Sequence, residues 1–199
     1  MRIVTAQELE SWLASGTVLE KDSRGPKVLM LSDGQILKIF HTRSHPVFSR
    51  LNPPAKKFAQ NALTLQQLGI PAPQIFETLW IDIAAGISAS IYQPLPGQSV
   101  ESILKETPEQ IDALIPQLAK FIKMLHLQGV YFRSLHLGNI LQLQNGQFGL
   151  IDFLDLTKKS RSLSSWEVSR NFKHLERYLM RRKLMSFPYK KLMNTYSKL

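Results

Sequence analysis

One short stretch constrains the fold of this chain more than any other: a polar loop over residues 131–139, followed by two apolar runs. The runs are Ile140–Leu143 and Phe148–Ile151, and Gln144-Asn-Gly146 lies between them. Two apolar runs joined by a short segment that contains Asn-Gly are typical of a β-hairpin. The sequence therefore predicts a polar loop that leads into a two-stranded hairpin.

Two side chains with metal-ligand character flank this hairpin. Asn139 precedes the first apolar run, and Asp152 follows the second. Because an antiparallel hairpin brings the start of one strand beside the end of the other, we expect these side chains to lie close together. An amide oxygen and a carboxylate oxygen are hard ligands of the kind that Mg²⁺ prefers. The stretch therefore predicts a magnesium site at one edge of the hairpin.

The composition indicates a folded protein without cysteine chemistry. With 199 residues and 44% hydrophobic side chains, the chain can form one compact or one two-lobed domain with a sizeable core. It has no cysteine and five scattered histidines, which excludes disulfides and cysteine-ligated zinc. The N-terminus reaches acidic residues where a signal peptide needs an apolar run, and no long uncharged apolar stretch follows. These features predict a soluble, cytoplasmic protein or one peripheral on a membrane.

The positive charge is concentrated near the C-terminus. Residues 1–155 contain 13 Lys and Arg against 13 Asp and Glu, whereas residues 156–199 contain 12 against 2. A solvated helix face explains any single lysine. A regional excess of this size also favours an anionic partner, which would be a phosphorylated glycolipid, a membrane surface of acidic phospholipid or nucleic acid. Nucleic acid ranks lowest, because the chain has no matching motif or aromatic platform.

The first part of the chain predicts a helix and a small antiparallel sheet. Thr5-Ala-Gln-Glu8 is a capping box for a helix that ends before Gly16. A second helix, with Asn52 as N-cap and Pro53 at its first position, precedes the last two of five predicted strands. Turn residues separate the five apolar runs, which cover residues 17–20, 27–31, 35–40, 74–83 and 87–92.

Lys38 has an unusual place in the third of these strands. It shares a face with Ile36 and Phe40, because side chains two residues apart in a strand point the same way. A lysine beside large apolar side chains usually has an anionic partner. The alternative is a lysine that protects a sheet edge from aggregation, and that alternative is favoured when the residue is taken by itself.

The second part of the chain predicts helices around the polar loop. Gln93–Gly97 is typical of a stiff connector. Capping boxes at Thr107-Pro-Glu-Gln110 and Ser164-Ser-Trp-Glu167 predict two helices, the first with a kink or restart at Pro116. A short basic helix is expected from Pro188. The helix after Ser164 is expected to bury four side chains: Trp166, Phe172, Leu175 and Leu179.

This order of elements resembles the protein-kinase-like fold. Lys38 stands where that family has its phosphate-contacting lysine. Arg133-Ser-Leu-His-Leu-Gly-Asn139 resembles the catalytic loop, and Ile151-Asp-Phe-Leu154 resembles the Asp-Phe-Gly motif. The Leu-His-x-Gly-Asn form is closer to small-molecule kinases than to protein kinases. The nearest resemblance is to the bacterial lipopolysaccharide kinases that act on Kdo or heptose sugars, together with their small relatives called toluene-tolerance proteins.

The resemblance implies an α+β, two-lobed protein-kinase-like fold. Residues 1–93 would form a small N-lobe with a five-stranded antiparallel sheet and one main helix, and residues 94–98 would form the connector. Residues 99–199 would form a reduced, mostly helical C-lobe. The resemblance also implies a phosphotransferase that uses ATP and Mg²⁺, at the inner face of the inner membrane. Its acceptor would be a sugar hydroxyl of an anionic envelope glycolipid.

The resemblance also assigns roles to three groups of residues. The catalytic group consists of Ser134, His136 and Arg133. The nucleotide-binding group consists of Lys38, Asn61 and Gly25. The metal-binding group consists of Asn139 and Asp152.

One departure from the family pattern lies in the catalytic loop. Ser134 replaces the family's aspartate, and a hydroxyl cannot act as a carboxylate base at neutral pH. His136 or Asp155 could take over the role, although an ordering role through hydrogen bonds is the favoured interpretation of His136. Phosphoryl transfer depends mainly on positioning and charge neutralisation, so a slow enzyme remains compatible with this loop.

Two further departures lie in the first part of the chain. Asn61 stands where the family has the glutamate that pairs with the strand lysine. Only Gly25 is present in the phosphate-covering loop, where Arg24 and Lys27 could contact phosphate instead. The departures favour an alternative function, that of a pseudokinase that binds nucleotide or a partner without phosphoryl transfer.

Overall fold

The computed structural model describes residues 1–41 and 46–199, without the side chains of residues 46–48. The described chain has an α+β fold, as expected, and divides into two compact units. Unit 1 contains Met1–Leu63 and Pro73–Leu95, and unit 2 contains Thr64–Ala72 and Pro96–Leu199. The predicted connector, residues 94–98, contains the last of the three boundaries between the units, after Leu95. Residues 64–72 belong to unit 2, although the sequence analysis assigned them to the N-lobe.

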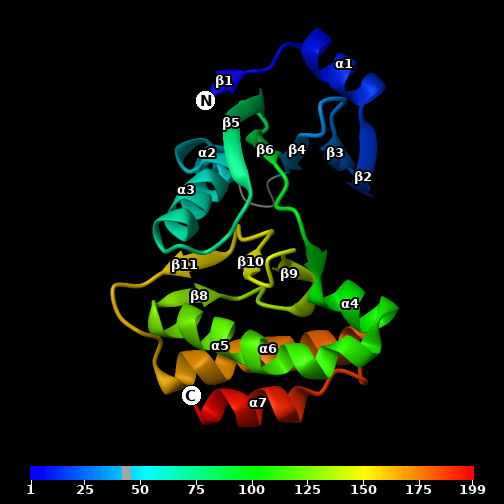
Figure 1. Cartoon of the computed structure of the whole chain (residues 1–199). Helices are drawn as coiled ribbons and strands as arrows, with labels where there is room; N and C mark the ends of the chain where they lie inside the picture. Colours follow the sequence, from blue (N-terminus) through cyan, green and yellow to red (C-terminus); the bar gives the residue numbers. More distant parts are fainter. Residues whose placement is uncertain (42–45) are drawn as a thin grey trace. The chain divides into compact units, whose positions relative to one another are not determined.

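Unit 1 is built on a six-stranded sheet in the order β1-β5-β6-β4-β3-β2 (Figure 1). The five predicted strands are antiparallel to their neighbours, and β1 adds a sixth strand that runs parallel to β5. The strands are β1 (Arg2–Ile3), β2 (Thr17–Asp22), β3 (Gly25–Met30), β4 (Ile36–Phe40), β5 (Gln74–Asp82) and β6 (Ile87–Gln93). The helices are α1 (Ala6–Ser15), α2 (Pro46–Leu51) and α3 (Pro54–Gln67), the last of which continues into unit 2 from Thr64.

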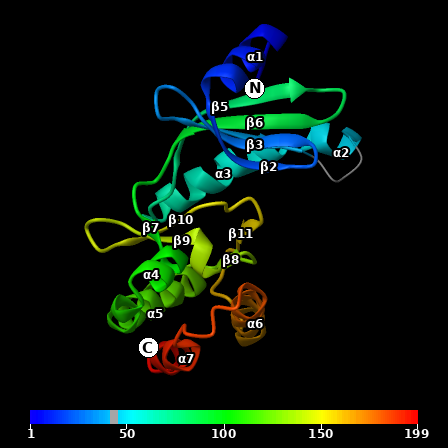
Figure 2. The same ribbon diagram turned by 90° about the vertical axis from the view of Figure 1, so that its right-hand side faces the viewer.

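The two faces of this sheet are covered by different helices (Figure 2). Leu37 and Ile39 belong to a buried cluster on one face, against which Trp12 of α1 packs. Phe40 points to the other face, where its ring lies 5.5 Å from the ring of Phe58 in α3. The alternation of side chains along β4 therefore gives each helix its own apolar surface. Because Lys38 alternates with Leu37 and Ile39, its side chain lies on the face that α3 covers.

The predicted start of α3 is wrong by one residue. The helix begins at Pro54, so Asn52 is not its N-cap and Pro53 is not its first helical position. The oxygen that satisfies a first-turn amide comes from the sheet instead, since the Ala55 N–H donates to the hydroxyl of Ser88 in β6 at 3.2 Å. A tertiary hydrogen bond therefore satisfies the helix start in place of the local cap that the sequence predicted.

Unit 2 combines helices with two small sheets (Figure 1). The sheets have the orders β10-β9-β7 and β11-β8, and α5 and α7 lie side by side. The strands are β7 (Gln98–Ser99), β8 (Val130–Phe132), β9 (Ile140–Gln142), β10 (Phe148–Leu150) and β11 (Leu156–Lys158). The helices are α4 (Val100–Glu106), α5 (Ile111–Leu127), α6 (Ser165–Arg182) and α7 (Tyr189–Ser197), with 3-10 turns at Pro108–Gln110 and Leu137–Asn139. The predicted hairpin is confirmed as the antiparallel pair β9 and β10.

Two expectations about α5 are corrected. Thr107 makes no cap hydrogen bond, and its hydroxyl donates to the carbonyl of Ile103 at 3.2 Å, at the end of α4. The α-helix itself is uninterrupted at Pro116. Proline lacks the N–H that would bond to the Asp112 carbonyl, and Lys191 of α7 donates to that carbonyl at 3.3 Å. A contact from another helix thus replaces the missing hydrogen bond.

The predicted capping box of α6 is confirmed, but the expected burial of Trp166 is wrong. Ser164 accepts from the Glu167 N–H, and the Glu167 carboxylate accepts from the Ser164 N–H at 2.7 Å. Trp166 is 66% exposed, and the guanidinium of Arg170 lies 5.1 Å from the centroid of its ring. The capping geometry turns Glu167 inwards, which leaves the preceding residue on the outer side of the first turn.

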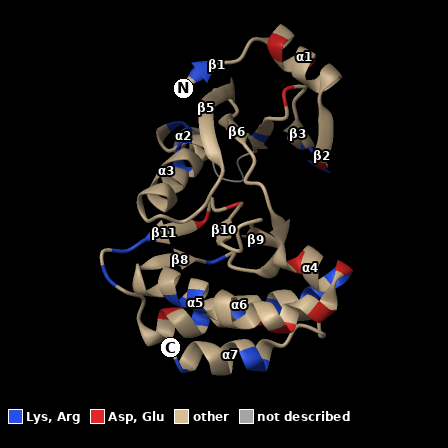
Figure 3. Ribbon diagram, viewed as in Figure 1, with Lys and Arg blue, Asp and Glu red and all other residues tan. Residues whose placement is uncertain are grey.

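Lys and Arg residues are spread along α6, α7 and the segment around β11 (Figure 3). Most of the basic residues of α6 and α7 are exposed. Among the described helices, none is both long enough and apolar enough to cross a lipid bilayer.

Candidate functional site

The polar loop after β8 is held by alternating buried residues. Leu135 and Leu137 are 4% and 0% exposed, whereas Ser134 and His136, which alternate with them, are partly exposed. The Leu135 N–H donates to the Phe132 carbonyl at 3.1 Å and the Asn139 N–H donates to the His136 carbonyl at 2.9 Å. The two leucines therefore anchor the loop and leave its polar side chains on the other side.

Asn139 lies at the end of this loop with its amide nitrogen bonded inwards. The residue is 7% exposed, and its Nδ2 donates to the Ser134 carbonyl at 3.0 Å. The same nitrogen lies 3.3 Å from Nε2 of His136. Because both contacts are made by the NH₂ end of the amide, Oδ1 is the atom that remains for a cation.

Asp152 is brought to the same edge by the hairpin. The Ile151 N–H donates to the Asn139 carbonyl at 3.0 Å, which fixes the next residue beside Asn139. Asp152 has a φ of 51°, in the left-handed region that residues other than glycine rarely adopt. Such a backbone costs about 1 kcal/mol or more and is typically retained where the side chain must point in a set direction. The hairpin thus brings together the two residues that the sequence predicted as metal ligands.

Ser134 makes a short hydrogen bond with an acidic side chain from the segment before β11. Its hydroxyl donates to Oδ2 of Asp155 at 2.6 Å. Nε of Arg133 lies 3.5 Å from the same oxygen. The other oxygen, Oδ1 of Asp155, is buried and has no hydrogen-bond partner among the described residues. The loop that lacks its own carboxylate therefore contacts a carboxylate from elsewhere in unit 2.

His136 is stacked rather than free. Its ring lies parallel to the ring of Tyr178 in α6, with 3.9 Å between the centroids. Burial lowers the pKa of His136, although the nearby carboxylates Glu101 and Asp152 act in the opposite direction. The imidazole is therefore neutral at pH 7, with Nε2 as the acceptor for Asn139. These contacts support the interpretation that His136 orders the loop.

A buried acidic side chain supports this stack, and the sequence analysis missed it. Glu101 of α4 accepts hydrogen bonds from the Tyr178 hydroxyl, from Lys105 Nζ at 2.5 Å and from Arg182 at 3.0 Å. Burial raises the pKa of Glu101, but these three hydrogen bonds outweigh that effect and bring it down to about 2. Burial and the bond to Glu101 raise the pKa of Tyr178 to about 12. No local sequence pattern distinguishes Glu101 from other helix glutamates, so only the fold identifies it.

The three predicted nucleotide-binding residues belong to unit 1. Lys38 is partly buried, and its Nζ lies 5.6 Å from the ring centroid of Phe58. Asn61 lies one helical turn after Phe58 on α3. Gly25 begins β3 with a φ of 114°, a backbone that favours glycine. Unit 1 therefore places Lys38 beside an aromatic side chain of the helix that carries Asn61.

The two basic side chains proposed for the phosphate-covering loop are already paired. Arg24 bonds to the Asp22 carboxylate at 3.0 Å, and Lys27 Nζ lies 2.5 Å from a Glu20 oxygen. Both pairs are on the β2 and β3 hairpin. Contact with phosphate would require these side chains to exchange one anionic partner for another.

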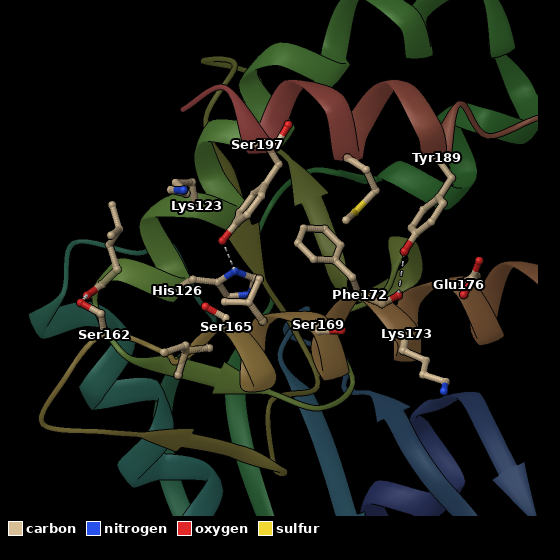
Figure 4. Close-up of a pocket in the computed structure, with 15 residues that line it drawn as sticks. Lys123, His126, Ser162, Ser165, Ser169, Phe172, Lys173, Glu176, Tyr189 and Ser197 are labelled. Carbon is tan, nitrogen blue, oxygen red and sulfur yellow. Dashed lines mark hydrogen bonds between the residues drawn. The ribbon is translucent and has the colours of Figure 1, made fainter.

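A cavity of about 700 Å³ lies in unit 2 among α5, α6 and α7 (Figure 4). At its wall, Nδ1 of His126 lies 2.8 Å from the Tyr196 hydroxyl and Nε2 lies 3.0 Å from Oδ1 of Asn171. Asn171 in turn donates to the carbonyl of Phe132 at 2.6 Å. Because Phe132 is the residue before Arg133, this network ties α5, α6 and α7 to the start of the polar loop. None of residues 133–139 lines the cavity.

Comparison with models of protein families gives a match over the second part of the chain. The model of the Lipopolysaccharide kinase (Kdo/WaaP) family matches residues 90–196. The matched range contains the polar loop, the hairpin, Asp152 and the basic helices, and it does not contain Lys38, Asn61 or Gly25. No curated protein matches the chain.

Proposed function

This chain belongs to the lipopolysaccharide kinase (Kdo/WaaP) family, and we propose that it is an ATP-dependent phosphotransferase. Its acceptor is a sugar hydroxyl of an anionic envelope glycolipid. What supports this proposal is the hairpin that brings the backbone next to Asp152 beside Asn139, after a loop with the family's spacing from position 134 to position 139. The fold is kinase-like, and the kinase family supports the use of nucleotide and of a divalent metal.

Mg²⁺ fits the residues at the hairpin edge. Oδ1 of Asn139 faces away from the contacts of Nδ2, and Asp152 is an exposed carboxylate on the neighbouring backbone. Within residues 1–41 and 46–199, no group of three or more His, Asp or Glu side chains is placed to hold a metal ion. A pair of protein oxygens is the usual set for Mg²⁺, which completes its coordination with water and substrate phosphates. When bound, the metal would neutralise charge on the transferring phosphoryl group.

The other residues of the proposed site bind the nucleotide and position the loop. Lys38 supplies the cation for the ATP phosphates, and Asn61 orients it with an amide in place of the family's carboxylate. Gly25 allows the β2 and β3 hairpin to approach the nucleotide. Arg133 and His136 hold the loop on which Ser134 meets the acceptor hydroxyl. Positioning and charge neutralisation account for most of the catalysis in phosphoryl transfer, so this set is suited to the reaction.

The basic surface of residues 156–199 is proposed to meet the anionic acceptor at a membrane. The exposed apolar side chains of Met180 and Met185 lie within this basic segment, at 58% and 73% exposure. Basic side chains are attracted to anionic headgroups, and exposed apolar side chains enter the interface beside them. The proposed location is the cytoplasm, in peripheral contact with the inner face of the inner membrane.

Nucleotide binding tests the proposal directly. ATP affinity is measured by calorimetry with and without Mg²⁺ for the native chain, Lys38→Ala and Asp152→Ala. We expect Mg²⁺ to strengthen binding to the native chain. Lys38→Ala should weaken binding by about tenfold or more, through the loss of a charge-assisted contact worth about 1.5–3 kcal/mol. Asp152→Ala should remove the response to Mg²⁺.

Two exposed side chains outside the proposed site provide matched controls. Lys56→Ala and Asp112→Ala should bind ATP as the native chain does. If the native chain does not bind ATP at any Mg²⁺ concentration, the phosphotransferase proposal is wrong. If it binds Mg-ATP but transfers no phosphate to inner-core lipopolysaccharide, the pseudokinase that Ser134 favours is the better description.

A further inference from the structure

The catalytic loop of this chain has no carboxylate of its own. Ser134 occupies the position where the family pattern has aspartate, and general-base assistance by such a group is worth about 10²–10⁴-fold in rate. A phosphotransferase with this loop needs another group to take the proton of the acceptor hydroxyl. His136 is poorly placed for this role, because Nε2 faces Asn139 and Nδ1 is buried in a ring that is stacked on Tyr178.

Asp155 is held next to Ser134 by the strand pairing of unit 2. β11 and β8 are antiparallel, with Leu156 opposite Phe132. The residue before Leu156 is therefore brought beside the residues that follow Phe132. The 2.6 Å bond from the Ser134 hydroxyl to Oδ2 of Asp155 is the result. This distance is typical of a hydroxyl that donates to a charged carboxylate.

The hydrogen bond leaves Ser134 able to accept a proton. A serine hydroxyl has one hydrogen and two lone pairs, and its hydrogen is directed at Asp155. An acceptor hydroxyl can therefore donate to the oxygen of Ser134. The acceptor hydroxyl cannot reach Asp155 directly through Oδ1. That oxygen is buried and has no hydrogen-bond partner among the described residues. Solvent access thus favours a route to the carboxylate through Ser134.

We infer that Asp155, acting through Ser134, replaces the missing carboxylate of the catalytic loop. As the acceptor oxygen bonds to the γ-phosphorus, the bond from that phosphorus to the leaving oxygen of ADP breaks. The acceptor proton passes to the oxygen of Ser134, and the Ser134 proton passes to Oδ2 of Asp155. Ser134 ends as a neutral hydroxyl and Asp155 as a carboxylic acid, which returns its proton to water after product release.

The charged and titratable groups around Asp155 are compatible with this role. Nε of Arg133 lies 3.5 Å from Oδ2, so a cation stands beside this carboxylate. Burial lowers the pKa of His174 in α6 and of His136 in the loop, although the charge of Asp155 acts in the opposite direction on both. Both histidines are therefore neutral at pH 7, and neither adds a positive charge near Asp155. This inference rests on the proposed phosphotransferase function.

An exchange of positions tests the inference. The variants Asp155→Asn, Ser134→Ala, Ser134→Asp and the double variant Ser134→Asp with Asp155→Asn are assayed for transfer of the γ-phosphate of ATP to inner-core lipopolysaccharide. Asp155→Asn and Ser134→Ala should each lower kcat by about 100-fold or more, with little change in KM or in Mg-ATP binding. The double variant should regain at least about tenfold over Asp155→Asn, because it restores a carboxylate at the family position.

The rescue separates a chemical role from a structural one. Were Asp155 only a support for the loop, Ser134→Asp would not restore a chain that lacks it. Asp112→Asn, an exposed aspartate of α5, is the matched control and should retain native kcat. If Asp155→Asn fails to fold, Ser134→Ala and its recovery as Ser134→Asp test the same route with Asp155 in place.

The outcomes also distinguish this inference from the proposed function. Native kcat in Asp155→Asn, or no recovery in the double variant, overturns the relay and leaves the phosphotransferase intact. No transfer by the native chain overturns both. Transfer gained only when Ser134 is changed to aspartate overturns the relay and identifies the native chain as a pseudokinase.

Discussion

Glu101 connects two helices of unit 2 to the ring that supports the polar loop. Its carboxylate accepts from Lys105 within α4 and from Tyr178 and Arg182 of α6, and Tyr178 stacks on His136. Its side chain is 8% exposed. A buried carboxylate with several donors is stabilising only while it is ionised. The stability of unit 2 is therefore expected to depend on the protonation of this residue.

Acid should weaken the protein through Glu101. The pKa of Glu101 is depressed to about 2 in the folded chain, below its value of about 4.3 in an unfolded chain. Its contribution is therefore complete above about pH 4.3 and is lost as the pH falls towards 2, with a total of about 3 kcal/mol. In Glu101→Gln, the fall in the free energy of unfolding between pH 6 and pH 2.5 should be smaller by about 2 kcal/mol, because the folded-state pKa is not yet passed at pH 2.5. Urea denaturation followed by circular dichroism at both pH values measures it.

The exposed carboxylate of Glu109 provides the control for this measurement. Glu109→Gln should show the same pH dependence as the native chain. If Glu101→Gln and the native chain lose stability in parallel between the two pH values, the charge of Glu101 does not stabilise unit 2.

The residues of the candidate site show how far single positions could be read from the sequence. The spacing of Asn139 and Asp152 around a hairpin predicted that they would lie close together, and in the structure the N–H of Ile151, the residue before Asp152, donates to the Asn139 carbonyl. The assignment of both as metal ligands remains a prediction. The partner of Ser134 could not be chosen from the sequence, because Asp155 lies 21 residues away and no local pattern links the two.

At the scale of elements, α6 begins with the most complete local signal in the chain. Ser164 and Glu167 bond to each other's backbone, and the Glu167 carboxylate also contacts Lys159 and Arg161. These bonds place the start of the helix against the segment that follows β11. A sequence signal and a tertiary contact therefore act on the same residue.

Removal of the cap should destabilise the chain. Ser164→Ala loses the hydroxyl that accepts from the Glu167 N–H, and we expect the free energy of unfolding to fall by about 1 kcal/mol. Ser169→Ala, on an exposed turn of the same helix, should cause no loss because alanine is the better helix former. Urea denaturation of both variants at pH 7 measures the difference. Equal stability of the two would show that the cap hydrogen bond is not stabilising.

The element predictions failed where another segment supplied the hydrogen-bond partner. Asn52 was expected to cap α3, but the Ala55 amide is satisfied by Ser88 of the sheet. A kink or restart was expected at Pro116, but α5 continues through it and Lys191 satisfies the freed carbonyl of Asp112. Thr107 matches the sequence pattern of a capping box, but its side chain makes no cap hydrogen bond. Sequence patterns describe local partners, so they miss partners that arrive from a distance.

At the scale of the whole molecule, the uneven charge is the feature with the clearest consequence. The excess of Lys and Arg lies in the last segment of the chain, and it is carried by α6, α7 and the residues around β11 (Figure 3). Attraction to a surface of acidic lipid is worth about 1 kcal/mol for each basic side chain near it. The proposed membrane contact should therefore depend on both lipid charge and salt.

Vesicle binding tests this contact. The native chain should sediment with phosphatidylglycerol vesicles and not with phosphatidylcholine vesicles, and binding should weaken as salt is raised. Met185→Glu places a negative charge in the basic surface and removes an exposed apolar side chain, so it should weaken binding by about tenfold or more. Leu51→Glu, at an exposed apolar position of unit 1, is the control. Equal binding by the two variants would exclude residues around Met185 from the contact.

The sequence by itself determined the features that depend on neighbours along the chain. These include the hairpin after the polar loop, the alternation that places Lys38 with Ile36 and Phe40, the cap of α6 and the basic C-terminal segment. Each is encoded by turn residues, by a period of two, by a cap three residues from its partner or by the count of charges. The α+β kinase-like fold followed from the order of these features.

The tertiary structure alone decided which distant side chains meet at the loop. Glu101 lies 77 residues from Tyr178 and 81 from Arg182, and Asp155 reaches Ser134 only because β11 pairs with β8. Such contacts depend on how buried surfaces pack and on which polar groups must find a partner once water is excluded. A pattern of neighbouring residues does not indicate which distant side chains will come into contact. The carboxylates that support the loop were therefore recognised only in the folded chain.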